Sequence, residues 1–508
     1  MNRKTYLFLI LYIFTTSLFS TIGFADSPSN VLVRVELPED FRQDILHFVR
    51  HYIETGTFKK TYPWMHQLTR YGPWSCTITF YRNGSVLSSG QGSERKTSDA
   101  LEKAIQDTFK NNDFRSDIDD TIICYIALSS RDTLPIHIIE YQGQALELSG
   151  NVIPVRFLDK NRIYSQIQSG KEYLLRTIHP EIHGFYKKYD VINNDFGKKI
   201  RTIYSASCLY TLLKIHALDH DPQIAQDIPK IAQFLLSMQV PEGNNQGAYY
   251  YSLDAKSLKK EQRFVTGTAS KTIFTMLSMY QYSQDPLFLQ SAIQAGKWLL
   301  TMQNTDGSII SEVYYKNGRW VVIHKFSFLY SGQVLSALSR LYHTTSDPIY
   351  YNGAKKTAIY IMNKARQQGY FVGDNYRSPN PVSTSWLIMS LLDYHKISHD
   401  EKARRIIIKT ATELIKKQCL NRYNILNYGR FIGSSTTSGN GWINEVFGEY
   451  YNFCTQYNKN ACPIYKNAIL LLTRWLIQNT YSEPNTFFLR NGEKAIGGLI
   501  RHPRENSV

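Results

Sequence analysis

From about residue 160 onward, apolar residues recur with helical spacing, and polar loops separate the helical segments. Two kinds of segment alternate, an amphipathic helix and a more apolar helix, with a long loop rich in Gly, Tyr, Asn and Asp after each amphipathic one. Amphipathic helices are expected near 166–178, 223–238, 287–302, 348–366, 400–418 and 463–479. More apolar helices are expected near 205–218, 268–282, 330–343, 383–397 and 440–453. The pattern predicts an all-α domain of helical hairpins over residues 159–508.

The ends of these helices repeat in sequence as well as in spacing. Amphipathic helices start after Asp-Pro, in which Asp caps the helix and Pro occupies its first position. They end in similar runs, of which the clearest pair is Met238-Gln239 and Met302-Gln303. The starts are Asp221-Pro222, Asp285-Pro286 and Asp347-Pro348, echoed by Cys462-Pro463. A period of about 60 residues suits a unit of two helices.

Residues 26–158 have a different pattern, in which short alternating segments are mixed with helices. Strands are expected at 31–37, 76–81, 121–128 and 136–141, and helices at 41–53 and 98–109. Asn83-Gly84 carries the signal of a tight hairpin turn. The pattern predicts a small α+β domain ahead of the all-α domain.

The first 25 residues have the layout of a secretory signal peptide. Arg3 and Lys4 precede an uncharged apolar stretch from Tyr6 to about Phe24, and Gly23 and Ala25 supply a small-residue cleavage site. The alternative is an uncleaved N-terminal membrane anchor, because the apolar stretch is long. We expect cleavage before Asp26 and a periplasmic or secreted protein.

The net charge of the chain indicates which class of binding partner to expect. The 508-residue chain has a formal charge of +16, and 43% of its residues are hydrophobic, as in globular proteins. An exported basic protein is expected to meet an acidic polysaccharide or another envelope glycan and no nucleic acid. The alternative is that the charge serves solubility alone. The 36 tyrosines suit sugar-lined clefts as well as cores.

The six cysteines show no metal-ligand spacing, so we expect no metal site and no cofactor. In an oxidising compartment, disulfides Cys454–Cys462 and Cys76–Cys124 are expected. Cys208 and Cys419 are expected to be buried thiols.

The hairpin repeat resembles the six-hairpin α/α toroid, a group that includes terpenoid cyclases, uronyl epimerases, glycosidases and polysaccharide lyases. In Gln303–Ser308, Gln-x-x-Asp-Gly-Ser resembles a toroid repeat motif in which Asp306 has a structural role. The sixth inner helix is missing from the pattern, so either an N-terminal helix fills its place or the ring is open. The order of elements over 70–140 also resembles the AMMECR-type α/β domain.

In such a ring the long loops and the starts of the inner helices meet at one end, where a site is expected. Acids and arginines there suit glycosidic-bond or proton-transfer chemistry, and tyrosines suit sugar faces. The expected catalytic residues are Glu312, Asp374, Glu445 and Glu449. The expected substrate-binding residues are Glu242, Tyr250, Arg263, Tyr314, Tyr376, Arg377, Arg430 and Trp442. A structural role or simple packing remains the alternative for each of them.

Two hypotheses follow. The first is an exported enzyme that acts on an acidic glycan as an epimerase, hydrolase or lyase. The second is a non-catalytic envelope protein that binds or assembles a glycan, which the missing helix favours. Terpenoid-cyclase chemistry is disfavoured, because the only Asp-x-Asp-Asp run, Asp117–Asp120, lies outside the helical domain. The sequence leaves the oligomeric state open.

Overall fold

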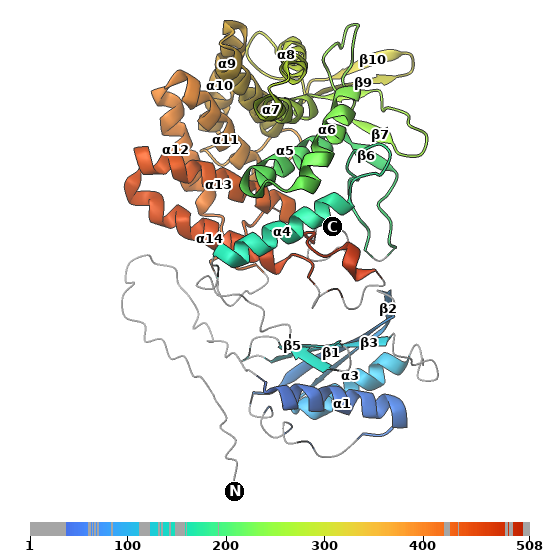
Figure 1. Ribbon diagram of the computed structural model, residues 1–508. Helices are drawn as coiled ribbons and strands as arrows, with labels where there is room; N and C mark the ends of the chain where they lie inside the picture. Colours follow the sequence, from blue (N-terminus) through green and yellow to red (C-terminus); the bar gives the residue numbers. More distant parts are fainter. Residues whose placement is uncertain are drawn as a thin grey trace. The chain divides into compact units, whose positions relative to one another are not determined.

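The computed structural model describes residues 37–500, except 59–61, 83–84, 111–121, 142–143, 148–157, 159, 192, 421–426, 435 and parts of 63–70, 131–135 and 483–490. The predicted signal peptide, most of the predicted strand 31–37 and the run Asp117–Asp120 lie outside the described residues. The chain divides into two compact units, of which one ends at Ile153 and the other begins at Pro154 (Figure 1).

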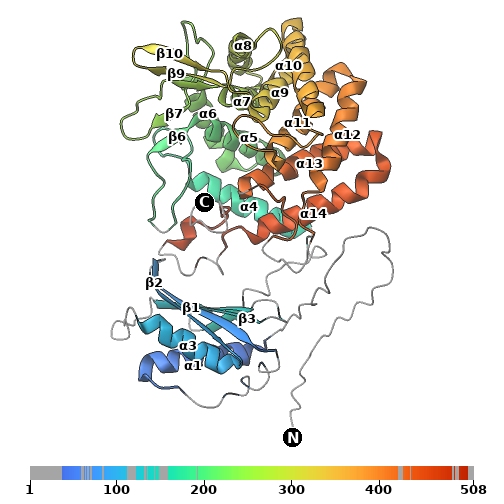
Figure 2. The ribbon, with the colours of Figure 1, turned by 180° about the vertical axis from the view of Figure 1, so that it is seen from behind.

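The first unit is a five-stranded antiparallel sheet with two helices. Its elements are α1 (Glu39–Thr55), β1 (Trp74–Arg82), β2 (Ser85–Glu94), α3 (Thr97–Lys110), β3 (Ile122–Ser130), β4 (Ile136–Tyr141) and β5 (Gln144–Glu147). The strand order is β2-β1-β3-β4-β5, and α3 packs on β1 and β2 (Figure 2). Its core includes Ile45, Val49, Ile78 and Ile126, so the apolar face of α1 and one face of the sheet are buried together.

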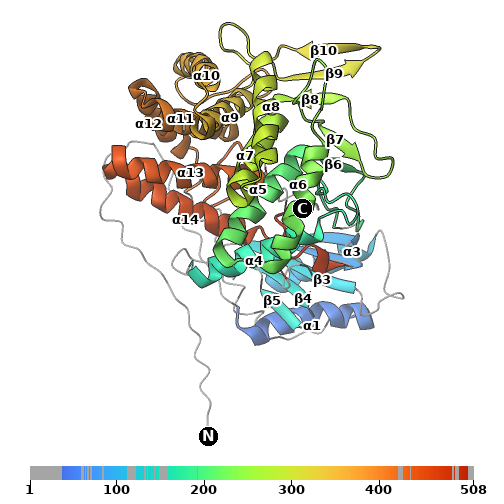
Figure 3. The ribbon, with the colours of Figure 1, turned by 45° about the horizontal axis from the view of Figure 1, so that its top comes forward.

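The second unit consists mainly of helices that alternate between an outer and an inner position (Figure 3). The outer helices are α4 (Lys160–Arg176), α6 (Pro222–Ser237), α8 (Pro286–Thr301), α10 (Pro348–Gln367), α12 (Glu401–Ile415) and α14 (Cys462–Gln478). The inner helices are α5 (Thr202–Asp219), α7 (Thr266–Ser283), α9 (Phe328–Thr345), α11 (Pro381–Ser398) and α13 (Thr437–Tyr457). Each of the eleven helices lies close to its expected range, apart from α4, which starts six residues earlier.

Burial separates the two kinds of helix. Outer helix α12 buries one stripe of residues spaced three and four apart, from Ala403 to Leu414. Inner helix α11 buries every residue from Ser383 to His395. The expected caps are present, because the Asp221, Asp285 and Asp347 side chains accept hydrogen bonds from backbone N–H groups in the first turns of α6, α8 and α10.

The long loops carry small sheets at the end where the inner helices start. Strands β8 (Arg263–Val265), β9 (Glu312–Lys316) and β10 (Arg319–Ile323) form one sheet in the order β10-β9-β8. Strands β6 (Lys199–Arg201) and β7 (Ser252–Asp254) form a second. Figure 1 shows these strands gathered on one side of the helical unit. Two short 3₁₀ helices, Lys459–Ala461 and Gly492–Lys494, complete the described elements.

Glutamines at the ends of α6, α8 and α12 tie these outer helices to the next outer helix. The Gln303 side chain donates to the Gly353 carbonyl and to the Thr357 hydroxyl of α10, at 2.8 and 2.7 Å. Asp306 accepts from the backbone and the hydroxyl of Ser308, and so shapes the turn that follows. These contacts agree with the structural role expected for Asp306.

The same turn joins the last outer helix to the first. Gly307 has a φ of +87°, and a Cβ there would lie 2.3 Å from the Lys356 carbonyl oxygen of α10. Gly497 has the same φ, and a Cβ there would lie 1.9 Å from the Ser169 carbonyl oxygen of α4. The segment after α14 therefore packs on α4 as other loops pack on the next outer helix, so the outer layer closes into a ring.

The inner layer has a gap among the described residues. Helix α7 packs against α5 and α9, and α11 packs against α9 and α13. Helices α5 and α13 each pack closely against a single inner neighbour, α7 and α11, within the described part of the chain. The position between α5 and α13 is thus the missing sixth inner place that the sequence pattern indicated.

The fold does not bring one of the two predicted cysteine pairs together. Cys76 lies opposite Leu128 in the β1–β3 register, and Cys124 lies opposite Phe80. The two cysteines are therefore about four residues, or about 13 Å, apart along the strands, too far for a disulfide. The predicted Cys76–Cys124 disulfide is wrong for this structure, in which burial keeps both as thiols. Cys208 and Cys419 are partly exposed thiols.

Cys454 and Cys462 lie together as two thiols, with sulfur atoms 3.0 Å apart. A disulfide needs about 2.05 Å between these atoms, which a small movement supplies. We expect peptide mapping without reductant to find the Cys454–Cys462 disulfide in protein from an oxidising compartment. Finding both residues alkylated as free thiols in that protein would contradict the prediction.

None of the helices within the described residues combines the length and the hydrophobicity of a bilayer-spanning segment.

Candidate active site

An ion pair joins two strands at the end of the helical unit where the inner helices start. Arg263 on β8 and Glu312 on β9 are joined through Arg263 Nε, 2.8 Å from Glu312 Oε2, and through a second, shorter guanidinium contact. Arg263 lies opposite Tyr314 in the β8–β9 register, so Glu312, two residues away, is on the same face of the strand pair. The Glu312 side chain is 14% exposed. The Arg263 side chain is 33% exposed, so the acid is the more buried partner of the pair.

Tyr251 lies between two guanidinium groups. The Arg201 and Arg263 guanidinium carbons are 4.6 and 4.4 Å from the centre of the Tyr251 ring. Arg201 also donates a hydrogen bond to the Tyr251 hydroxyl. A negative charge that develops on this hydroxyl would face two positive charges.

Two further tyrosines complete the group of side chains. The Tyr330 and Tyr376 rings meet edge to face, with centres 6.0 Å apart. Burial raises the pKa of Tyr330 to about 12, with smaller contributions from Tyr251 and Glu312. Tyr330 therefore stays protonated at neutral pH and can donate a hydrogen bond or a proton. Arg377 lies close enough to act electrostatically on Tyr330. We call Arg201, Tyr251, Arg263, Glu312, Tyr330, Tyr376 and Arg377 the mouth cluster.

Asp374 holds the backbone next to this cluster. One of its carboxylate oxygens accepts from the Phe328 backbone N–H at 2.9 Å and from the Ser327 hydroxyl at 3.2 Å. The other accepts from the Tyr376 and Arg377 N–H groups, at 3.0 and 3.1 Å. Four donors therefore occupy the Asp374 carboxylate, which ties the start of α9 to the turn that carries Tyr376 and Arg377.

A second group of side chains lies further along the inner helices. The ammonium of Lys271 on α7 lies 5.2 Å from the Trp442 ring, 5.7 Å from Trp386 and 5.2 Å from Phe274. The two indoles stack with centres 3.9 Å apart. Burial lowers the pKa of Lys271 to about 8, against the opposing effect of Glu445. Such a lysine is partly neutral near physiological pH, which suits proton transfer.

Ion pairs between inner helices surround this lysine. Glu445 on α13 pairs with Lys214 on α5 at 3.5 Å, and Glu449 pairs with Lys396 on α11 at 3.4 Å. Arg340 on α9 donates to Asp393 on α11 at 2.9 Å. The predicted acids Glu445 and Glu449 therefore face the inside of the ring, each with a cation, away from the Arg263–Glu312 pair.

Several predicted residues lie outside both groups. Glu242 is exposed in the turn after α6, at the place in the repeat that Asp306 holds in the next. The Tyr250 ring packs on Phe264 and Lys260 instead of the mouth cluster. Arg430 contacts Asn427 and the Trp475 ring of α14. These three positions are not brought to the candidate site.

Sequence reasoning therefore missed four residues, Arg201, Tyr251, Tyr330 and Lys271. Three of them lie just before or within the first two turns of an inner helix, where a charged or phenolic side chain interrupts an apolar pattern. That interruption is the signal that was available in the sequence.

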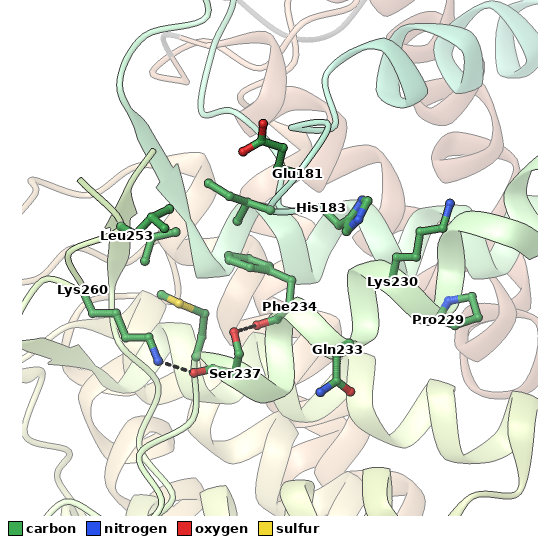
Figure 4. A pocket seen from close by; sticks show the side chains of 12 residues that line it. Glu181, His183, Pro229, Lys230, Gln233, Phe234, Ser237, Leu253 and Lys260 are labelled. Atoms are coloured by element: carbon green, nitrogen blue, oxygen red, sulfur yellow. Dashed lines mark hydrogen bonds between the residues drawn. The ribbon is translucent and has the colours of Figure 1, made fainter. Parts of the chain in front are cut away.

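A separate cavity of about 720 Å³ lies against α6 (Figure 4). Its lining includes His183, Lys230, Phe234 and Lys260. None of the predicted site residues lines it, and Lys260 donates to the Ser237 carbonyl across one side. It is therefore distinct from the candidate site.

The lowered pKa of Lys271 predicts a pH dependence of stability. Its folded pKa is below that of an unfolded lysine, so between about pH 8 and about pH 10 the unfolded chain binds more protons. The free energy of unfolding is therefore expected to rise across this interval, by about 1–2 kcal/mol after allowance for the exposed part of the side chain. Urea unfolding of the wild type and of Lys271→Met should show this rise only in the wild type. An equal rise in both proteins would contradict it.

No family model and no curated protein matches the chain. Solved structures do match. Cellobiose 2-epimerase from Bacillus thermoamylovorans matches with 15% identity and a TM-score of 0.52 over 64% of this chain and 89% of that chain. A D-mannose isomerase matches with 15% identity and a TM-score of 0.51 over 66% and 90%. A GH76 α-mannanase from Bacteroides thetaiotaomicron matches with 12% identity and a TM-score of 0.51 over 68% and 90%.

The helical unit is an α/α toroid. The resemblance expected from the hairpin repeat is thus confirmed at the level of the fold. At these identities the likeness concerns the fold alone, and chemistry has to be argued from this chain's own residues. The comparisons give no support to the expected AMMECR-type resemblance of the first unit.

Proposed function

We propose that this toroid is a carbohydrate-active enzyme that acts on an acidic glycan, with the mouth cluster as its active site. The observation that carries the proposal is the mouth cluster itself, in which three arginines and three tyrosines lie together with Glu312 where the inner helices start. Arginine forks suit a uronate carboxylate, and tyrosine rings suit sugar faces. The fold shared with a sugar epimerase, a sugar isomerase and a mannanase supports a carbohydrate substrate.

The reaction that the cluster favours is proton abstraction at the carbon next to a uronate carboxylate. In this scheme Arg263 and Arg377 bind the carboxylate and stabilise the negative charge that develops there. Tyr251 acts in this scheme as a phenolate, whose negative charge faces the Arg201 and Arg263 guanidinium groups, and it becomes a neutral phenol when it accepts the proton. Return of a proton from Tyr330 to the opposite face gives an epimer, whereas departure of the glycosidic oxygen gives an unsaturated sugar.

Hydrolysis by two carboxylates is less well supported. Such enzymes place a free acid and a free carboxylate on either side of the scissile bond. Among the described residues of the mouth cluster and its surroundings, Glu312 is bound to Arg263, and Asp374 is occupied by backbone donors. Glu445 pairs with Lys214 further along the ring.

The test is incubation of the purified protein with uronate-containing oligosaccharides in deuterated water. We expect deuterium at the carbon next to the carboxylate, detected by NMR, or the ultraviolet absorbance of an unsaturated uronate. New reducing ends with neither signal would favour a hydrolase. Binding without any chemical change would favour the non-catalytic glycan-binding alternative.

We also propose that the protein is exported, on the strength of the N-terminal signal pattern. Sequencing of the mature N-terminus should find Asp26 first. An intact Met1 in protein recovered from the cell envelope would show an uncleaved anchor instead.

A further inference from the structure

The gap in the inner layer forms a groove of about 700 Å³ along α5. Helix α4 lines one side of it through Ile167 and Leu174, and the start of α13 lines another through Thr437 and Ser438. On α5, Tyr204, Thr211 and Leu218 are spaced seven residues apart and form one stripe along the groove. Tyr204 and Leu218 are 40% and 68% exposed, so this stripe of the helix is open.

The opposite side of the groove is also uncovered. Gly441 and Gly448 share a face of α13 with Ser438 and Glu445 by their spacing. A Cβ at either glycine would meet no atom within 4 Å. The Lys214–Glu445 ion pair joins α5 and α13 at 3.5 Å between these two glycines, so the open space lies beside this contact along α5, a helix about 27 Å long.

The charges that line the groove have one sign. The lining contains five cations and no carboxylate within the described residues. The cations are Lys171, Lys187, Lys188, Arg201 and Lys214. Lys171 and Lys214 have acidic partners outside the lining, Asp221 and Glu445. Lys187 and Lys188 lie next to one another on the loop before α5 and also line the groove.

The groove is continuous with the mouth cluster through Arg201. This residue lines the groove and also donates to Tyr251. Its Nε is buried and has no hydrogen-bond partner among the residues that the structure describes. Because a buried donor without a partner is costly, this atom is suited to a ligand oxygen that enters from the groove.

We infer that the groove binds a stretch of acidic glycan chain that extends from the active site, so that the protein recognises a polymer several sugars long. The inference rests on the proposed function and names its substrate as a chain instead of a single sugar. The apolar faces of sugar rings pack on Tyr204 and the aliphatic residues of α5, and uronate carboxylates face Lys187, Lys188 and Arg201. One-sided charge and continuity with Arg201 favour this occupant over a helix from another protein.

The test compares binding of oligouronates of increasing length, from disaccharide to octasaccharide, by isothermal titration calorimetry. The groove variant is Lys187→Ala/Lys188→Ala. The matched control is Lys355→Ala/Lys356→Ala, which removes two adjacent exposed lysines from the outer face of α10. We expect wild-type affinity to rise at least about tenfold with length. The groove variant should lose about three- to tenfold in affinity for the octasaccharide, little for the disaccharide, and the control should lose neither.

Affinity that does not depend on length would overturn the inference, as would equal losses in the groove variant and the control. A groove that takes up a synthetic acidic amphipathic helix but no oligouronate would also overturn it. Because calorimetry measures binding and not turnover, this test of the groove can fail or succeed independently of the proposed enzyme activity. Length-dependent binding without turnover would support the groove and contradict the proposed enzyme activity. Turnover of short substrates without length-dependent binding would support the enzyme activity and contradict the groove.

Discussion

The substitution Tyr251→Phe is expected to lower kcat on a uronate substrate by about 10²–10⁴-fold, the usual contribution of a positioned acid or base. The phenylalanine ring keeps the stacking with Arg201 and Arg263, which lie 4.6 and 4.4 Å from the ring centre. The loss is confined to the hydroxyl that accepts from Arg201. We therefore expect KM to change much less than kcat.

The neighbouring tyrosine supplies the matched control. Tyr250→Phe makes the same chemical change one residue away, on a ring that packs on Phe264 and Lys260. It should leave kcat within about twofold, since no group of the mouth cluster is altered. Circular dichroism and the thermal midpoint should be unchanged in both variants. Equal turnover in Tyr251→Phe and Tyr250→Phe would refute the role given to Tyr251.

A second variant tests whether Glu312 positions Arg263 or is itself the reacting group. Glu312→Gln keeps the shape of the side chain and removes the charge that holds Arg263. If Glu312 positions Arg263 for a carboxylate, the variant should raise KM and make it more sensitive to salt. A loss of kcat with unchanged KM would instead make Glu312 the reacting group, as the sequence analysis expected.

Part of the fold could be predicted from the sequence alone. The helical hairpins follow from apolar periodicity and Asp-Pro starts, because capping and burial are local and repeat with the unit. Asp221, Asp285 and Asp347 act as predicted. The missing sixth inner place could also be counted in advance.

The choice among neighbouring tyrosines could not be made in advance. Tyr249 is buried with its hydroxyl 2.6 Å from Ser291, Tyr250 packs on Phe264, and Tyr251 joins the mouth cluster. Three adjacent residues of one type point in three directions, and only the pairing of the short strands decides which one meets Arg201. Likewise, nothing in the sequence shows that four backbone and hydroxyl donors occupy Asp374.

The substitution with the largest expected effect on stability is Arg340→Met in the interior of the ring. Asp393 is 5% exposed, and its main partner is the Arg340 guanidinium, 2.9 Å away. Burial alone would lower the pKa of Arg340, but Asp393 and Tyr210 together outweigh the cost of burial, so that the pKa is raised. Methionine fills much of the same volume and leaves Lys396, at 3.9 Å, as the remaining ion-pair partner of Asp393 among the described residues. We expect the free energy of unfolding to fall by about 2–4 kcal/mol.

Restoring neutrality should recover much of this loss. In Arg340→Met/Asp393→Leu no charge is left without a partner, and an apolar pair of similar volume often equals or exceeds a buried ion pair in stability. A surface pair gives the control, since Glu413→Ala, which removes the partner of exposed Lys416, should cost at most about 1 kcal/mol. Urea unfolding of the three variants and the wild type measures each of these changes in the free energy of unfolding. If Arg340→Met lowers the free energy of unfolding no more than Glu413→Ala does, then water reaches Asp393. In that case the ion pairs inside the ring stabilise the inner helices far less than their burial indicates.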